Sequence, residues 1–202
     1  MKIYVDGENF RHAVANVLIA NGKITGSRDL EGFPLRGLLE DVLDVADLDI
    51  AYYSSKVKLP RGYEPSAKIL QRASEIREYN RKWVANLISQ KIEHIKAGYL
   101  KVKSGDACAS CGEVSEILQE KGVDVRLAVD IITETHGKKK GTKIALMSSD
   151  SDLIPAVDRA RKSGIYVIYL CFGEFVNRAL SQAADETVTI SSTKSIHYFE
   201  GK

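Results

Sequence analysis

Long apolar runs are missing from this sequence, and so is the cysteine framework of a small secreted protein. No stretch approaches the roughly 18 consecutive apolar residues of a membrane-spanning helix. The N-terminus runs straight into a strand-like segment, without the charged and apolar regions of a signal peptide. Three cysteines are an odd number and give no set of disulfides. Together these absences predict a cytoplasmic protein with no membrane partner.

Several nucleotide-handling signatures are also absent. Neither the phosphate-loop pattern G-x-x-x-x-G-K-[ST] nor the dinucleotide pattern G-x-G-x-x-G occurs. The segment Asp6-Gly-Glu lacks the Asp-x-Asp-x-Thr pattern of haloacid dehalogenase-like phosphatases. These three classes of enzyme are therefore disfavoured. The net charge of +2 is too small to establish a polyanionic partner by itself.

What is present is the composition of a folded protein, with 44% apolar and 28% charged residues. The 202 residues fit one domain, 1–202, with a small insertion at 104–112. Strand-length apolar runs alternate with helical patterns, which predicts a three-layer α/β/α sandwich around a mostly parallel sheet. The expected strands are 3–5, 48–53, 99–102, 143–147, 165–170 and 187–190. The expected helices are 66–95, with a break near Tyr79, 125–135 and 153–162.

Aspartates follow two of the expected strands. Asp6 ends the first strand, and Asp150 and Asp152 follow the fourth in Ser148-Ser-Asp-Ser-Asp152. Parallel sheets bind ligands at the carboxyl ends of their strands, so these side chains are expected to converge. Asp124, at the start of a helix, is a third candidate. Asp130, six residues later, points about 120° away from Asp124 on a regular helix.

Carboxylates gathered in one cleft repel each other unless their pKa values rise or a cation compensates the charge. All-oxygen ligation suits Mg²⁺ or Mn²⁺, and such ions activate water for phosphodiester hydrolysis. No set of histidines or cysteines accompanies these motifs, which argues against zinc. Gly7, directly after Asp6, permits a close backbone approach to a ligand. Taken singly, however, each aspartate is also a common helix cap.

Polar and basic side chains near these motifs are candidates for substrate binding. Asn9 can contact a metal-bound water or a substrate phosphate, and Ser149 and Ser151 can orient Asp150; all three can equally cap a helix. The exposed loop Lys138, Lys139 and Lys140 is expected to approach the acidic edge. Further basic residues suit a nucleic-acid track or merely a solvated face: Lys56, Lys58, Arg61, Lys68, Arg72, Arg77, Arg81 and Lys82.

Cys108-Ala-Ser-Cys111 has the spacing of a zinc or redox motif. A lone pair of cysteines completes no zinc site, so an ordinary loop is the favoured interpretation. A zinc site shared across a homodimer stays open as an alternative.

Three segments together resemble the NYN family, a branch of the PIN-like ribonuclease superfamily, and within it the bacterial LabA-like group. They are Tyr4-Val-Asp-Gly-Glu-Asn-Phe10, Lys121-Gly-Val-Asp-Val-Arg-Leu-Ala-Val-Asp130 and Ser148-Ser-Asp-Ser-Asp-Leu-Ile-Pro-Ala156. The resemblance implies a Rossmann-like PIN sandwich, a Mg²⁺ or Mn²⁺ site and cleavage of RNA. The residues that match the family's acidic positions are Asp6, Asp124, Asp130, Asp150 and Asp152. Asn9 matches their polar companion, and Ser149 stands where many relatives have glycine.

The sequence therefore predicts a metal-dependent nuclease, specifically an endoribonuclease acting on single-stranded or structured RNA. Asp6, Asp124 and Asp150 are the expected catalytic residues, and Asp130 and Asp152 are expected to assist them as metal ligands. The alternative is a non-catalytic regulatory NYN module that binds RNA, a nucleotide or a protein partner.

Overall fold

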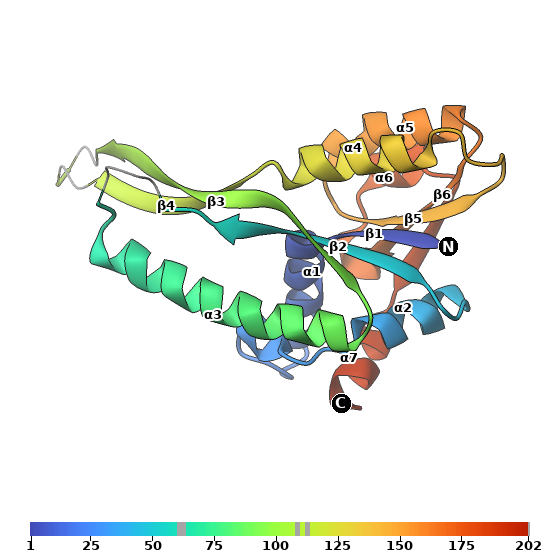
Figure 1. The fold of residues 1–202 in the computed structure, drawn as a ribbon. Coiled ribbons are helices and arrows are strands. Elements are labelled where there is room, and N and C mark those ends of the chain that lie inside the picture. Colours follow the sequence, from blue (N-terminus) through green and yellow to red (C-terminus); the bar gives the residue numbers. More distant parts are fainter. Residues whose placement is uncertain (60–63, 108–109, 112–113, 202) are drawn as a thin grey trace.

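The computed structural model describes residues 1–59, 64–107, 110–111 and 114–201. Its described part contains a seven-stranded sheet in the order β4-β3-β2-β1-β5-β6-β7 (Figure 1). Every neighbouring pair is parallel except β3 and β4, which are antiparallel. The strands are β1 (Lys2–Asp6), β2 (Asp49–Val57), β3 (Glu93–Ala107), β4 (Val114–Lys121), β5 (Lys143–Met147), β6 (Tyr166–Phe172) and β7 (Glu186–Ile190).

Helices cover both faces of the sheet. One core lies under α1 (Gly7–Ala20), α2 (Leu35–Leu43), α3 (Ala67–Ser89) and α7 (Ser192–Glu200). The other lies under α4 (Val123–Thr135), α5 (Ile154–Lys162) and α6 (Arg178–Ala183). Three short 3₁₀ helices are η1 (Ser27–Leu30), η2 (Ser151–Leu153) and η3 (Gly173–Phe175). Within the described ranges, no helix combines the length and apolar character needed to cross a membrane.

The two cores follow from the alternation of side chains along each strand. In β1, Ile3 and Val5 enter the core under α1, whereas Tyr4 between them enters the core under α4. All three side chains are fully buried. Because both faces of the central strands are covered, these strands have continuous apolar runs in the sequence.

The predicted α/β fold class is confirmed, and each of the six expected strands is present. Strand β4 was not expected, and β3 is longer than predicted, so residues 104–107 form strand where a loop was expected. The expected helix 66–95 is wrong at its end. Helix α3 runs unbroken past Tyr79 and stops at Ser89, since Lys91 adopts φ 56° and cannot continue a right-handed helix. Residues 93–95 then begin β3.

Two features of this topology position the candidate site. The chain leaves β1 towards β2 on one side and returns to β5 on the other, so β1 and β5 flank a switch point, where open α/β sheets bind ligands. Strands β3 and β4 extend beyond the rest of the sheet as a two-stranded arm, with α3 running alongside (Figure 1). The arm returns the chain to the sheet edge, where α4 begins.

Candidate metal centre

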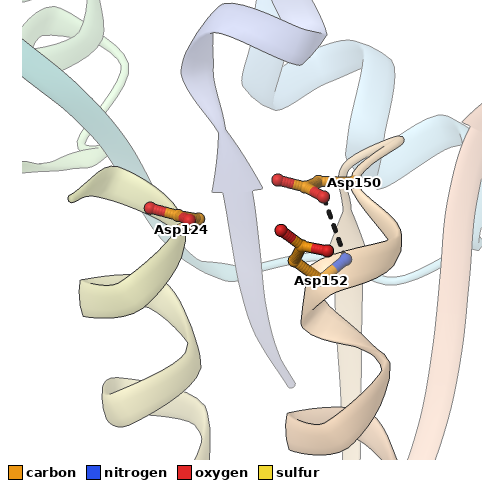
Figure 2. Close-up of side chains that lie close together, drawn as sticks. All are labelled: Asp124, Asp150 and Asp152. Carbon is orange, nitrogen blue, oxygen red and sulfur yellow. Dashed lines mark hydrogen bonds between the residues drawn. The ribbon is translucent and has the colours of Figure 1, made fainter. Parts of the chain in front are cut away.

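Three aspartates meet at the carboxyl edge of the sheet. Asp124 lies in the first turn of α4, Asp150 follows β5, and Asp152 lies in η2. Each offers a carboxylate oxygen, and these oxygens lie within 4.8 Å of one another. Figure 2 shows Asp124 on α4 at one side of the group and Asp150 and Asp152 on the segment after β5 at the other. Oxygens bound to one Mg²⁺, Mn²⁺ or Ca²⁺ ion lie at most about 4 to 5 Å apart, so the spacing and the all-oxygen donor set fit a divalent cation.

Asp124 reaches this position through the turn that precedes α4. The residue before the helix is Gly122, with φ 84°, a left-handed conformation that glycine adopts at little cost. This turn joins the end of β4 directly to α4 and leaves Asp124 in the first turn, partly exposed. The positive end of the helix dipole favours a carboxylate at this place.

Asp150 is held by the turn after β5. Its backbone N–H donates to Ser148 Oγ at 3.1 Å, and its Oδ1 accepts from the backbone N–H of Asp152 at 2.9 Å (Figure 2). Asp150 therefore caps η2 with one oxygen. Its other oxygen accepts no hydrogen bond from the part of the chain that the structure describes, and remains available to a ligand.

Asp6 lies behind this group and not in it. Its carboxylate is 4% exposed and accepts from Asn9 N at 3.2 Å, from Asn9 Nδ2 at 2.6 Å and from Ser148 Oγ at 3.0 Å. Burial raises the pKa of Asp6; these hydrogen bonds oppose the rise, and the charge of Asp150 adds to it. The mutually close carboxylates found among the described residues do not include Asp6. Asp6 caps α1 and contacts the residues beside the group, and its expected role as a metal ligand stays a prediction.

Asp130 is also outside the group. It is 9% exposed, and both of its oxygens accept from Arg126 Nε, at 2.8 and 2.9 Å. The hydroxyl of Tyr53 donates to Oδ2 at 3.1 Å. Its carboxylate is thus compensated by a cation of the protein. The rotation of about 120° expected from helix geometry separates it from Asp124, and the structure gives no support to the metal-ligand role that the resemblance implied.

Lys138, Lys139 and Lys140 lie at the opposite edge of the sheet. Helix α4 runs back along the sheet, so that Glu134 near its end contacts Lys2 Nζ, at the start of β1, at 2.6 Å. The loop after α4 leads into the amino end of β5, whereas Asp150 follows the carboxyl end of that strand. The expectation that these lysines approach the acidic edge is wrong.

The polar residues around the aspartates form one network. Asn9 holds Asp6 with two N–H groups and accepts with Oδ1 from the Ser149 hydroxyl. Ser151 is exposed at the start of η2, between Asp150 and Asp152. Asn9 and Ser149 therefore connect α1 to the loop after β5, and both side chains lie beside the acidic group.

Gly7 does allow a close approach, but to the protein itself. A Cβ at this position would lie 2.4 Å from Tyr52 Cε1 and 2.6 Å from the backbone oxygen of Tyr53. Tyr52 also donates its hydroxyl to Gly7 O at 2.9 Å. The glycine lets α1 start tightly against β2, which fixes the direction in which Asp6 and Asn9 point. The expected close approach to a ligand is replaced by this packing contact.

Sequence reasoning assigned no role to two supporting residues. Ser148 bridges Asp6 and Asp150, and Asn177 donates from Nδ2 to Ser149 O at 2.8 Å while its Oδ1 caps α6. Ser148 is the first polar residue after an apolar strand, and Asn177 directly precedes a helix. Both residues are polar and stand next to the end of an element, which the sequence shows. The residues that they contact depend on tertiary structure, which the sequence does not show.

A hollow of about 190 Å³ adjoins the network on the α1 side of the sheet. Asn9 and Asn16 of α1 line it together with Ser149, and its walls are mostly apolar, including Phe172 and Phe175. Cys171 also lines it, and burial raises the pKa of this thiol. The hollow thus places a mostly apolar recess beside the polar network of the acidic edge.

The expected cysteine motif is only partly visible. Cys111 is exposed, and Cys108 lies outside the described residues.

The NYN domain model matches residues 1–191 of this chain. No curated protein matches this chain. Among solved structures, it is similar to the crystal structure of a protein of unknown function from Vibrio parahaemolyticus. That likeness has 16% sequence identity and a TM-score of 0.46, and covers 94% of this chain and 91% of the other.

Proposed function

Because the chain belongs to the NYN domain family, a PIN-like nuclease family, we propose that it is a nuclease that depends on a divalent metal and hydrolyses RNA phosphodiester bonds. The observation that carries the proposal is the group Asp124, Asp150 and Asp152, whose oxygens lie within 4.8 Å of one another. Family membership supports a nuclease type of function, and the spacing and donor type support Mg²⁺ or Mn²⁺ as its cofactor.

In this proposal Asp124, Asp150 and Asp152 hold the cation. When bound there, such an ion would lower the pKa of a coordinated water and compensate negative charge on the phosphate. Asp6 keeps Asn9 and Ser148 in place, and Ser148 in turn fixes the turn that carries Asp150. The exposed hydroxyl of Ser151 can hydrogen-bond the substrate beside the ion, whereas Asn9 and Ser149 are bonded to each other and hold the polar edge in place.

Electrostatic compensation is the physical reason why a cation belongs here. Three carboxylates whose oxygens lie within 4.8 Å of one another repel each other. The negative charge of Asp150 also raises the pKa of Asp6. Asp130, by contrast, has its own cation in Arg126. Within the described chain, no lysine or arginine forms an ion pair with Asp124, Asp150 or Asp152. A divalent ion relieves this repulsion, as in other all-oxygen sites.

The test combines metal titration with cleavage. Asp124→Asn and Asp150→Asn are each expected to weaken Mn²⁺ binding, followed by calorimetry, and to abolish cleavage of a labelled RNA in Mg²⁺ or Mn²⁺. Asp49→Asn is the matched control, because Asp49 is exposed at the amino end of β2, on the opposite edge. Circular dichroism checks that each variant is folded.

Cleavage that persists in both site variants, or in EDTA, would remove the basis of the proposal. RNA binding by the parent chain without cleavage in either metal would instead assign the non-catalytic role. Parallel assays with single- and double-stranded RNA and DNA define the substrate class.

A further inference from the structure

A second hollow, of about 380 Å³, lies between α3 and the adjoining strands β2 and β3. We call it the cationic hollow, because the charged side chains that line it are Lys56, Arg77, Arg81 and Lys96. Its other lining residues are Ser54, Ser55, Val57, Asn80, Val84 and His94. No acidic residue lines it in the described structure.

These four cations are not compensated by the protein. Each is exposed, and in the described ranges none of them forms an ion pair. Other basic residues behave differently: Arg28 pairs with Glu75 at 2.6 Å, and Arg161 pairs with Asp185 at 2.8 Å. Four like charges around one hollow create a positive potential that attracts anions.

The cationic hollow also contains uncharged polar side chains that are bonded to each other. Ser54 Oγ and His94 Nε2 lie 2.8 Å apart in a hydrogen bond. Burial, followed by the charge of Lys96, lowers the pKa of His94, so the ring is neutral at pH 7. The hollow therefore combines neutral hydrogen-bonding groups with positively charged side chains.

The strand register relates the cationic hollow to the acidic group. Asp6, the last residue of β1, pairs with Tyr53, so Ser54 to Lys56 continue beyond the carboxyl end of β1. Lys96 pairs with Ser54 on the next strand. The hollow thus lies at the same edge of the sheet, within two strand spacings, about 10 Å, of β1. It opens on the α3 face, whereas Asp124 comes from α4 on the other face.

We propose that the cationic hollow binds backbone phosphates of a single-stranded nucleic acid, which crosses the edge of the sheet to reach the acidic group. This inference rests on the proposed nuclease function, because that function makes a nucleic acid the ligand. A volume of about 380 Å³ is within the range of small-ligand pockets and matches one or two nucleotide units. A positive groove that follows the backbone is the usual device for single strands.

The experiment measures binding in EDTA, where cleavage is absent, by fluorescence anisotropy with a labelled single-stranded RNA. The double variant Arg77→Ala/Arg81→Ala is compared with Lys138→Ala/Lys139→Ala. Both variants remove two exposed cations, but the second pair lies at the opposite edge of the sheet. Lys56→Ala/Lys96→Ala tests the strand side of the hollow. Melting curves confirm that all variants are folded.

Each double variant in the cationic hollow is expected to weaken binding about tenfold at low salt. It is also expected to reduce the slope of log K against log salt by about 1.4, since each phosphate contact on a single strand contributes about 0.7. The control pair should leave both values close to those of the parent chain. Equal losses in the control, or no loss in either hollow variant, would overturn the inference.

The outcome is separable from that of the nuclease proposal. If RNA is bound through the hollow but never cleaved, the inference holds and the nuclease function fails. If RNA is cleaved but the hollow variants bind normally, the nuclease function holds and the inference fails. Binding measured with single-stranded DNA and with duplex RNA tests the preference for a single strand. Tighter binding of the duplex would contradict this preference.

Discussion

Asp6 and Asp150 are joined by one hydroxyl group, that of Ser148. The hydroxyl donates to Asp6 Oδ2 at 3.0 Å and accepts from the backbone N–H of Asp150 at 3.1 Å. The hydrogen bond between Ser148 and Asp6 is buried and connects residues 142 positions apart in the sequence. It makes the buried carboxylate of β1 and the acidic turn after β5 one structural unit.

Ser148→Ala tests this unit. Removing the hydroxyl leaves Asp6 with one donor fewer and releases the turn of Asp150, so we expect a loss of unfolding free energy of about 1 to 3 kcal/mol. Loss of a supporting hydrogen bond also weakens metal sites by roughly 10- to 100-fold. Urea unfolding and Mn²⁺ titration measure the two effects. Ser151→Ala, at an exposed position in the same segment, should change neither by a comparable amount.

Asp130→Asn is expected to separate stability from metal binding. The substitution weakens the interaction with Arg126 and disturbs the acceptor of the buried Tyr53 hydroxyl, which should cost about 1 to 2 kcal/mol of stability. The affinity for Mn²⁺ should stay within a few-fold of the parent value, because Asp130 lies outside the acidic group. A folded Asp130→Asn protein that no longer binds Mn²⁺ would show that the residue acts as a ligand after all.

Gly7→Ala should be strongly destabilising. Its Cβ would meet both the Tyr52 ring and the Tyr53 backbone at less than contact distance, and the backbone of a central strand cannot yield. Overpacking of this kind typically costs about 1 to 3 kcal/mol, and a clash with backbone places this variant near the upper end. Gly26→Ala is the control, since a Cβ there has no atom within 4 Å in the described structure. Equal midpoints of urea unfolding for the two variants would show that α1 can shift away from β2.

Asp185 gives a pH dependence with a defined sign. Burial by itself raises the pKa of Asp185, but Arg161 and the N–H of Val167, which donate at 2.9 Å each, hold it below its ordinary value. The stabilisation is therefore complete above the unfolded pKa of about 3.9 and is lost as the pH falls through the folded value.

Asp185→Asn should accordingly reduce the unfolding free energy at pH 7 by about 1 kcal/mol, a modest value because the pair is partly exposed. The difference from the parent chain should shrink as the pH falls below about 3.9. Urea unfolding at several pH values measures it. Asp158→Asn, which removes a carboxylate from α5 with no ion pair in the described chain, should show a smaller pH-dependent change.

The elements that could be predicted from sequence are those with a strong local signal. The strands buried on both faces, such as β1 and β5, appear as continuous apolar runs. Strand β4 has no such run, because it is a half-exposed edge strand with charged residues on both faces. The end of α3 depends on the left-handed conformation of Lys91, which is unusual for lysine and carries no sequence signal.

The residues of the candidate site likewise differ in how far the sequence predicts their positions. Asp124, Asp150 and Asp152 follow strands or begin a helix at one edge, so topology alone brings them together. Asp6 ends a strand at that edge too, but its carboxylate caps α1 through Asn9 N and accepts two further hydrogen bonds, from Asn9 Nδ2 and Ser148 Oγ. The sequence does not distinguish such a cap from a ligand. The sequence predicts that the loop of Lys138, Lys139 and Lys140 approaches the acidic edge. Because α4 runs back along the sheet before this loop, the loop lies at the opposite edge of the sheet.

The aspartates that meet at the acidic edge come from two crossovers of the sheet. Asp124 follows the β3–β4 arm and the Gly122 turn in the chain, whereas Asp150 comes after α4 and β5. An ion that binds all three aspartates therefore recognises the assembled sheet and not any single segment. At a hundred times its Kd, such an ion would add about 2.7 kcal/mol to the unfolding free energy. Cation concentration would then shift the folding equilibrium towards the assembled sheet, so that metal acts on the stability of the fold as well as on its chemistry.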